Sequence, residues 1–268
     1  MPLTPFQAEV IAVISGNRSE TSHFAGGLVL NSSPASARYS HDFDIFHEAA
    51  EEVSHACETD AASIRAAGFT FELVVGDWDK HSTFRKAKVS RGADSVDIDW
   101  AADSAFRFFP IERDPLLGWR LHLFDMATNK ALALAARSVS RDYVDIIELG
   151  KIFPLQAIVW AAVGKDPGYA PLFLLALMRR FARVRREDLV ELQARNLDPI
   201  ALKMEWTDMA EAAGNAMKHL ADTQPDTPIG VAFVDAAGKP GWLGDDPTLK
   251  VHEPCIRGCL PTISGLSL

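Results

Sequence analysis

The chain has 268 residues, of which 48% are hydrophobic and 24% are charged. This composition is typical of a folded globular protein long enough to bury a sizeable core, and it excludes a disordered, collagen-like or disulfide-scaffold protein. Because 36 Asp and Glu outnumber 27 Lys and Arg, the formal net charge is −9. We therefore expect no DNA partner, although a local basic groove stays compatible with the sequence.

The sequence shows no sign of secretion or membrane insertion. Its N-terminal stretch lacks the basic start, apolar run and cleavage site of a signal peptide. The longest apolar run, residues 152–163, is too short to cross a bilayer. Cys57, Cys255 and Cys259 are too few and too scattered for a disulfide framework, and the last two are expected to be free thiols. We therefore expect a cytoplasmic protein without a membrane partner.

The first part of the chain combines helical and extended patterns. A helix is expected over residues 5–15 and another over residues 47–67, where Gly68 is placed to end it. Between them, residues 42–46 alternate with the period of a strand, so the side chains of Asp42 and Asp44 should share one face.

Strands dominate the next part of the chain. Alternation and turn residues predict strands over residues 69–75, 83–90, 95–101 and 119–124. In the second of these, Arg85 lies on one face, and Lys86 and Lys88 lie on the other.

From residue 125 the pattern becomes helical. Five helices are predicted, over residues 125–137, 140–152, 152–163, 171–195 and 199–221. Ser140 is placed to cap the second of them. Pro225 and Pro228 mark a linker, after which residues 230–243 resemble a hairpin with a turn near Gly238, followed by an irregular tail. The predicted plan is α+β: a core over 1–124, a helical domain over 125–224 and a hairpin-like extension over 225–268.

Two carboxylates two residues apart on a strand point the same way and lie about 7 Å apart along the backbone. Asp99, in the strand SVDIDWA, can join Asp42 and Asp44 from a neighbouring strand. Such a cluster repels itself unless a cation offsets its charge, and hard carboxylate oxygens suit Mg²⁺, or Mn²⁺ as an alternative. Asp97 shares a face with Asp99 and is the alternative third ligand.

Mg²⁺ takes its remaining ligands from water and phosphate, which indicates a phosphorylated substrate. Gly26 and Gly27 would let backbone N–H groups approach phosphate oxygens. Lys130 on the following helix would offset phosphate charge, or is only a solvated helix residue. Together these parts fit in-line attack at the α-phosphate of a nucleoside triphosphate such as ATP, GTP or CTP.

Two stretches carry a family resemblance. The run GGLVL…ARYSHDFDIF resembles the GG…R-x-S-x-D-x-D-x-F signature of nucleotidyltransferase-fold proteins of the AbiEii/MenT type, the toxin components of abortive-infection and toxin–antitoxin pairs. The run DMATNKALALAARSVSRDYVDIIEL resembles the helical motif D-x-x-x-x-K-x-x-A-L…R…RD-x-x-D of that family. The resemblance covers roughly residues 20–150. The chain departs from the more general fold signature, which has Gly-Ser where Gly26-Gly27 stands here.

The resemblance implies a polymerase-beta-like mixed sheet with flanking helices, followed by a helical half. It also assigns roles to residues. The implied catalytic and metal-binding carboxylates are Asp42, Asp44 and Asp99, with Lys130 as the catalytic lysine, and the implied nucleotide-binding residues are Gly26, Gly27, Arg38, Ser40, Lys130, Asp142 and Asp145.

Several of these residues have a second interpretation. Arg38 either contacts phosphate or pairs with Asp44, and Ser40 either holds phosphate or braces the strand start. Arg141 with Asp142 or Asp145 fits a purely structural ion pair equally well.

The resemblance further implies a Mg²⁺-dependent transferase that moves a nucleoside monophosphate to an RNA, such as a tRNA 3′ end, or to a protein, with a cognate antitoxin as partner. The alternatives are a non-catalytic nucleotide-binding or regulatory member of the same fold, and a glycosyltransferase, in which D-x-D also holds a metal–diphosphate.

Two clusters outside the motifs have simpler explanations. His23, His41 and His47 lack zinc-ligand spacing, and the nearby carboxylates suit Mg²⁺ better. The run with five arginines over residues 179–186 favours a solvated helix face over an RNA contact.

Overall fold

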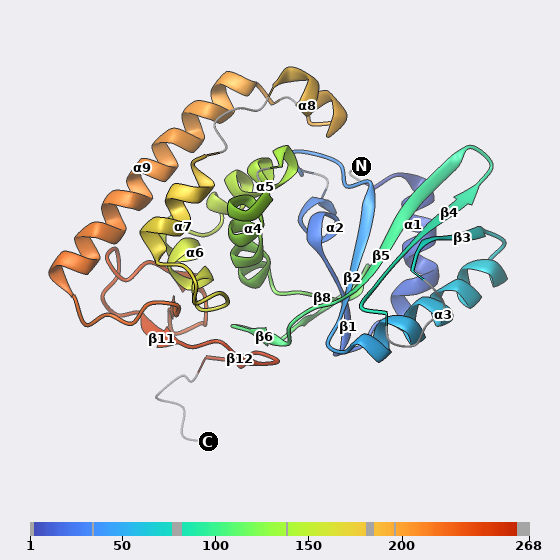
Figure 1. The fold of residues 1–268 in the computed structure, drawn as a ribbon, viewed down its shortest axis with the longest axis horizontal. Helices are drawn as coiled ribbons and strands as arrows, with labels where there is room; N and C mark the ends of the chain where they lie inside the picture. Colours follow the sequence, from blue (N-terminus) through green and yellow to red (C-terminus); the bar gives the residue numbers. More distant parts are fainter. Residues whose placement is uncertain are drawn as a thin grey trace. The chain divides into compact units, whose positions relative to one another are not determined.

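The computed structural model describes residues 3–33, 35–76, 82–137, 139–180, 185–195 and 197–261. These residues form two units (Figure 1). The first contains the described residues up to 105 together with 111–122, and the second contains residues 106–110 and the described residues from 123 onward. Pro34, which precedes the D-x-D strand, lies outside the described residues.

The first unit is an α+β layer. Its elements are α1 (Pro5–Ile14), a 3₁₀ turn (Ser15–Asn17), β1 (Ser22–Ala25), α2 (Gly26–Asn31), β2 (Asp42–His47), α3 (Ala50–Ala66), β3 (Thr70–Val75), β4 (Phe84–Arg91), β5 (Asp94–Ala102), β7 (Glu112–Asp114) and β8 (Gly118–Arg120). Helix α1 begins with a capping box, in which Thr4 accepts from the Gln7 backbone and the Gln7 side chain accepts from the Thr4 backbone.

The seven strands form one mixed sheet in the order β3-β4-β5-β2-β1-β8-β7. Strand β2 pairs in parallel with β5, and β4 pairs antiparallel with the other side of β5. Consequently the residues of β2, β5 and β4 stand in straight rows across the sheet. This confirms the mixed sheet with flanking helices that the sequence predicted.

One face of this sheet is the hydrophobic core of the unit. Helices α1 and α3 pack over it, as Figure 1 shows. The alternation of β2 and β5 sends Phe43, Ile45, Ile98 and Trp100 into this core, where all four are fully buried. The intervening residues of the same strands therefore point to the opposite face.

A buried ionic network fastens the core side together. Asp60 on α3 accepts hydrogen bonds of 2.6 Å from the Arg18 guanidinium and of 2.8 Å from Trp100 Nε1 on β5. Asn17 Nδ2 donates a further bond of 2.8 Å to the same carboxylate. Because the side chains of Arg18 and Asp60 are both fully buried, neither charge has water as an alternative partner.

The second unit is a helical bundle with small strands. Its elements are β6 (Phe106–Arg107), α4 (Leu123–Arg137), α5 (Ser140–Gly150), α6 (Leu155–Ala162), α7 (Pro171–Met178), α8 (Arg186–Glu191), α9 (Pro199–Thr223), β9 (Ala232–Val234), β10 (Pro240–Gly241), β11 (Lys250–His252) and β12 (Cys255–Ile256). Asp198 caps α9 by accepting from the Ala201 backbone at 2.8 Å.

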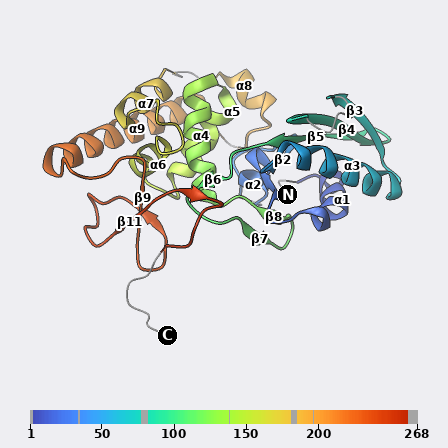
Figure 2. The ribbon, with the colours of Figure 1, turned by 60° about the horizontal axis from the view of Figure 1, so that its bottom comes forward.

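The C-terminal strands belong to this helical unit. Strands β10, β9 and β11 form a three-stranded sheet, and β9 packs on α6 (Figure 2). Trp160 of α6 and Trp242 meet edge to face at 5.6 Å. The predicted hairpin is confirmed, with Gly238 at φ +82° in its turn, but the tail predicted to be irregular contains β11 and β12.

Three other predictions were wrong in detail. The strand expected over 119–124 is the short β8, because α4 already begins at Leu123. Ser140 does not cap α5; Val139 precedes that helix without a side-chain cap. Of the single helix expected over 171–195, α7 ends at Met178, residues 181–184 lie outside the described residues, and α8 begins at Arg186, where the Asp188 side chain accepts from the Arg185 backbone at 2.8 Å.

None of the helices in the described part of the chain combines the length and the apolar character needed to span a bilayer.

The Asp60 network gives a stability prediction. Asp60→Ala leaves the Arg18 charge buried without a partner, so we expect the free energy of unfolding to fall by about 3–5 kcal/mol. The exposed Arg91–Glu9 pair is the matched control, and Glu9→Gln should cost less than about 1 kcal/mol. Urea unfolding measures both, and equal losses for the two variants would contradict this account.

Candidate functional site

Four aspartates share the face of the sheet that α1 and α3 leave uncovered. Asp42 and Asp44 on β2 lie directly beside Asp97 and Asp99 on β5, pair by pair, because the two strands run parallel in register. Asp42 and Asp44 therefore lie on the same face of β2, as the strand period predicted. The structure also places Asp99 next to Asp44.

Strand β4 adds two cations to the same rows. Lys86 lies opposite Asp99 and Lys88 lies opposite Asp97. The Lys86 ammonium nitrogen is 3.1 Å from Asp97 Oδ2 and 3.2 Å from Asp99 Oδ1, so it bridges both carboxylates of β5. Sequence reasoning placed Lys86 on the face away from Arg85 but did not assign it to the site, because the pairing of β4 with β5 is not visible in a local pattern.

Asp99 is the more enclosed of the two carboxylates on β5, with 19% of its side chain exposed against 40% for Asp97. Burial raises the pKa of Asp99, the charges of Asp42 and Asp97 add to this, and Lys86 opposes it; the net direction is upward. The buried Oδ1 of Asp99 meets the Lys86 ammonium nitrogen at 3.2 Å, so Lys86 is its charge partner.

The glycine pair between β1 and α2 is shaped around Asp44. Gly26 has φ +62°, and a Cβ on it would lie 1.8 Å from Asp44 Oδ2. A Cβ on Gly27 would lie 2.6 Å from Ser40 Oγ and 2.9 Å from Arg38 Nη2. Both positions therefore require glycine, because side chains of the site occupy the space that a Cβ would fill.

Arg38 and Ser40 support this corner. The buried Arg38 donates from Nη1 to the Tyr39 carbonyl at 2.8 Å. Ser40 Oγ lies 3.3 Å from both the backbone oxygen and Oδ1 of Asp42, and its own carbonyl accepts from Gln7 Nε2 at 2.7 Å. Ser40 therefore braces the start of β2, which is one of the two roles that the sequence suggested for it.

The residues present fit a divalent cation in their chemistry. Asp42, Asp44 and Asp99 offer hard oxygen ligands. In this structure the Lys86 ammonium lies 3.2 Å from Asp99 Oδ1, and the Gly27 N–H donates to Asp44 Oδ2 at 3.4 Å. Among the described residues, however, no three His, Cys, Asp or Glu side chains already stand close enough to hold a metal. A cation would therefore have to draw these side chains together.

The second unit contains the other predicted residues. Lys130 Nζ lies 2.8 Å from Asp142 Oδ1 and 3.0 Å from Asp145 Oδ2, and Arg137 Nε lies 2.6 Å from Asp142 Oδ2. The structural partners of Asp142 thus include Lys130 and Arg137. Lys130, Asp142 and Asp145 are all buried.

Charge pairing in this cluster outweighs burial. Burial alone would lower the pKa of Lys130, but the carboxylates of Asp145 and Asp142 raise it above its ordinary value. Burial alone would raise the pKa of Asp142, but hydrogen bonds from Arg137 and the charge of Lys130 leave it below its ordinary value. Both groups are therefore charged at neutral pH.

The remaining clusters form no site of the kind considered from the sequence. His23 and His47 are buried and His41 is exposed, and the described residues contain no zinc-ligand group. Cys255 and Cys259 are free thiols, as expected.

The arginine run is partly engaged within the chain. Arg180 donates to the Ala135 carbonyl at 3.2 Å, and Arg185 pairs with Asp188 at 2.8 Å. Arg183 lies outside the described residues.

The glycine turn gives a matched test. Gly92 has φ +63° with nothing within 4 Å of an added Cβ, whereas Gly26 has nearly the same φ but meets Asp44. Gly92→Ala should therefore cost about 1 kcal/mol of unfolding free energy from backbone strain alone. Gly26→Ala should cost at least about 1 kcal/mol more, because Asp44 must move. Equal costs in chemical denaturation would show that Asp44 does not occupy this space.

The Lys130 cluster gives a pH prediction. Because the pKa of Asp142 is depressed in the folded state, its contribution is complete above about pH 5 and is lost as pH falls below about 4. Asp142→Asn should lower stability by about 3–5 kcal/mol at pH 7, with a difference from the wild type that shrinks toward pH 3. A difference that stays constant in urea unfolding from pH 7 to 3 would argue against a charged Asp142.

No protein-family model and no curated protein matches the sequence. Solved structures do match the fold. A protein from H. pylori that is classed provisionally as a nucleotidyltransferase has 14% identity and a TM-score of 0.52, over 81% of this chain and 99% of its own. JHP933 from Helicobacter pylori has 14% identity and a TM-score of 0.50, and the match covers 84% of this chain and 98% of JHP933. MenT4, a nucleotidyltransferase toxin from Mycobacterium tuberculosis H37Rv, has 16% identity and a TM-score of 0.53, and the match covers 82% of this chain and 89% of MenT4. The chain therefore has the fold of the MenT-type nucleotidyltransferases.

Proposed function

We propose that the protein is a Mg²⁺- or Mn²⁺-dependent nucleotidyltransferase. The observation that carries the proposal is the row of carboxylates from β2 and β5, set side by side next to a glycine turn that only glycine can form. The likeness of the fold to nucleotidyltransferases supports it. Four acidic groups on one face are costly unless a cation and a phosphorylated substrate use them.

In this proposal Asp42, Asp44 and Asp99 hold the metal, with Asp97 as the alternative to Asp99. The metal, when bound, would offset charge on the triphosphate and on the pyrophosphate leaving group. The acceptor hydroxyl gives its proton to Asp99, and its oxygen bonds to the α-phosphorus as the bond from that phosphorus to the bridging oxygen breaks. Asp99 is assigned this role because it is the more enclosed carboxylate of β5 and lies beside Asp44.

The resemblance of the helical motif adds Lys130, Asp142 and Asp145 to the nucleotide-binding residues of this proposal. Lys130 keeps its charge between two carboxylates and can offset phosphate charge, while Asp142 and Asp145 orient its ammonium group. Arg38 and the backbone of Gly26 and Gly27 take phosphate oxygens.

The acceptor and the biological role follow the toxin among the structural neighbours. MenT4 is described as a nucleotidyltransferase toxin. We propose a toxin-like role here, with a tRNA 3′ end or a protein as acceptor, a cognate antitoxin as partner and the cytoplasm as its location.

One observation favours a second candidate, a non-catalytic nucleotide-binding or regulatory member of the fold. Lys86 already bridges Asp97 and Asp99, and no three metal-ligating side chains converge among the described residues. Calorimetric titration with Mg²⁺ and each triphosphate separates the two: nucleotide binding without any transfer product favours this candidate.

The transfer reaction is tested with each α-labelled triphosphate, Mg²⁺ and a total extract of RNA and protein. Label should enter one RNA or protein band, and Asp44→Ala should reduce that label at least about a hundredfold without unfolding the protein. Full transfer by Asp44→Ala would refute the assignment.

The third carboxylate is identified by a matched pair. Asp99→Asn should abolish transfer like Asp44→Ala, because Asp99 is the more enclosed and lies beside Asp44. Asp97→Asn, which removes the same charge two residues away, should stay within about threefold of the wild type. The reverse pattern would make Asp97 the ligand, and unchanged transfer in both would exclude β5 from the chemistry.

A further inference from the structure

The last described part of the chain carries two cysteines on one tight turn. Cys255 begins β12, and Cys259 follows soon after that strand. The Gly258 N–H donates to the Cys255 carbonyl at 3.1 Å, which closes the turn. Arg257 and Gly258 both have a left-handed backbone, with φ +68° and φ +67°. Because the chain reverses here, Cys259 comes back toward Cys255.

Both cysteines are also fixed to the same short segment of the helical unit. Cys255 lies opposite Arg107 in the antiparallel pair of β12 with β6, and Figure 1 shows these two strands side by side. The Cys259 N–H donates to the carbonyl of the next residue of that segment, Phe108, at 3.2 Å. The turn and the two anchors therefore hold the cysteines close together, as a disulfide requires.

The thiols of this pair affect each other. Burial and the hydrogen bond with the Cys255 thiol raise the pKa of Cys259. Cys259 is exposed and Cys255 is half-buried, so a reagent in solvent reaches Cys259 more easily. No third His, Cys, Asp or Glu within the described ranges joins the pair to complete a metal site. The pair is therefore better suited to thiol chemistry than to a metal ion.

We propose that Cys255 and Cys259 form a reversible disulfide in exchange with a small disulfide such as oxidised glutathione. The thiolate of Cys259 attacks one sulfur of the glutathione disulfide, and a glutathione thiolate leaves. Cys255 then gives up its proton and attacks the Cys259 sulfur of the mixed disulfide, which expels the second glutathione. The two cysteines together lose two electrons and two protons, and the glutathione disulfide gains them.

This disulfide would fasten β12 to a segment that α4 already holds. The backbone N–H groups of Phe108 and Phe109 donate to the Asp125 carboxylate at 2.8 Å and 2.9 Å, and Asp125 stands in the first turn of α4. An exposed disulfide is among those that thiols reduce most readily. The link is therefore one that forms and opens with the thiol–disulfide balance of its surroundings.

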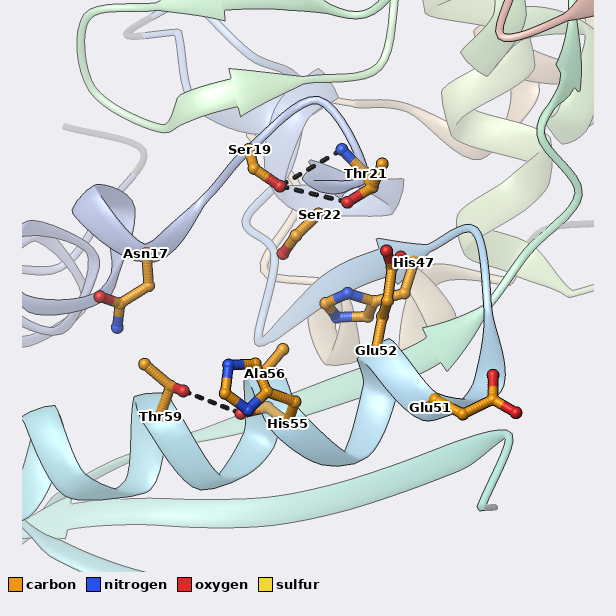
Figure 3. A pocket seen from close by; sticks show the side chains of 10 residues that line it. All are labelled: Asn17, Ser19, Thr21, Ser22, His47, Glu51, Glu52, His55, Ala56 and Thr59. Carbon is orange, nitrogen blue, oxygen red and sulfur yellow. Dashed lines mark hydrogen bonds between the residues drawn. The ribbon is translucent and has the colours of Figure 1, made fainter. Parts of the chain in front are cut away.

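Cys57 is the internal control for this chemistry. It is fully buried in α3, and burial raises the pKa of its thiol to about 11. The cavity beside α3, drawn in Figure 3, is lined by Ala56 and Thr59 of that helix but not by Cys57. This cavity therefore does not expose the thiol. We expect Cys57 to stay reduced in the folded protein.

The disulfide is tested by treating the reduced full chain with oxidised glutathione and mapping its thiols by mass spectrometry. We expect the intact mass to fall by two hydrogen atoms, with one link between Cys255 and Cys259 in the peptide map and an unmodified Cys57. A reductant should restore all three thiols. Glutathione left attached to either cysteine of the wild type, links between two copies of the chain, or no reaction of the folded protein would overturn the proposal.

Matched variants separate the two steps. Cys255→Ser removes the thiol that closes the ring, so the glutathione adduct on Cys259 should accumulate at least about tenfold above the wild type. Cys57→Ala should form the link as the wild type does. An adduct that accumulates equally in the wild type and in Cys255→Ser would contradict ring closure. Nucleotide transfer is not part of this readout, so the result is independent of the proposed function.

Discussion

The repulsion among four carboxylates is the constraint on which the rest of the first unit depends. The parallel register of β2 and β5 forces Asp42 beside Asp97 and Asp44 beside Asp99, and the antiparallel pairing of β4 places a lysine at the end of each row. In this structure Lys86 offsets part of that negative charge by bridging the two carboxylates of β5. A sheet face with this charge pattern contributes little to stability, which is why we assign it to chemistry.

The other features of the unit keep that face open. Gly26 and Gly27 have no side chain at the point where Asp44, Ser40 and Arg38 approach. The hydrophobic core lies on the opposite side of the same strands, under α1 and α3. The buried network around Asp60 joins α3 to β5 on that core side, away from the acidic face.

Local patterns in the sequence predicted much of this. Strand alternation placed Asp42 and Asp44 on one face, and the two motifs predicted the fold that the structural neighbours share. What local patterns could not reveal was long-range pairing: the place of Lys86 depends on which strand lies beside β5, and the partnership of Arg137 with Asp142 depends on how α4 packs on α5. The start of α8 was missed because Asp188 acts as a cap, a signal that an apolar pattern does not contain.

The most direct test of the central claim is a crystal structure with Mn²⁺ and a non-hydrolysable nucleoside triphosphate, with anomalous scattering recorded at the manganese edge. The account predicts a manganese peak bounded by the carboxylates of Asp42, Asp44 and Asp99, with the triphosphate beside it and the Lys86 ammonium withdrawn from Asp99. A nucleotide bound elsewhere, or manganese absent from this face while Lys86 keeps both of its carboxylates, would contradict it.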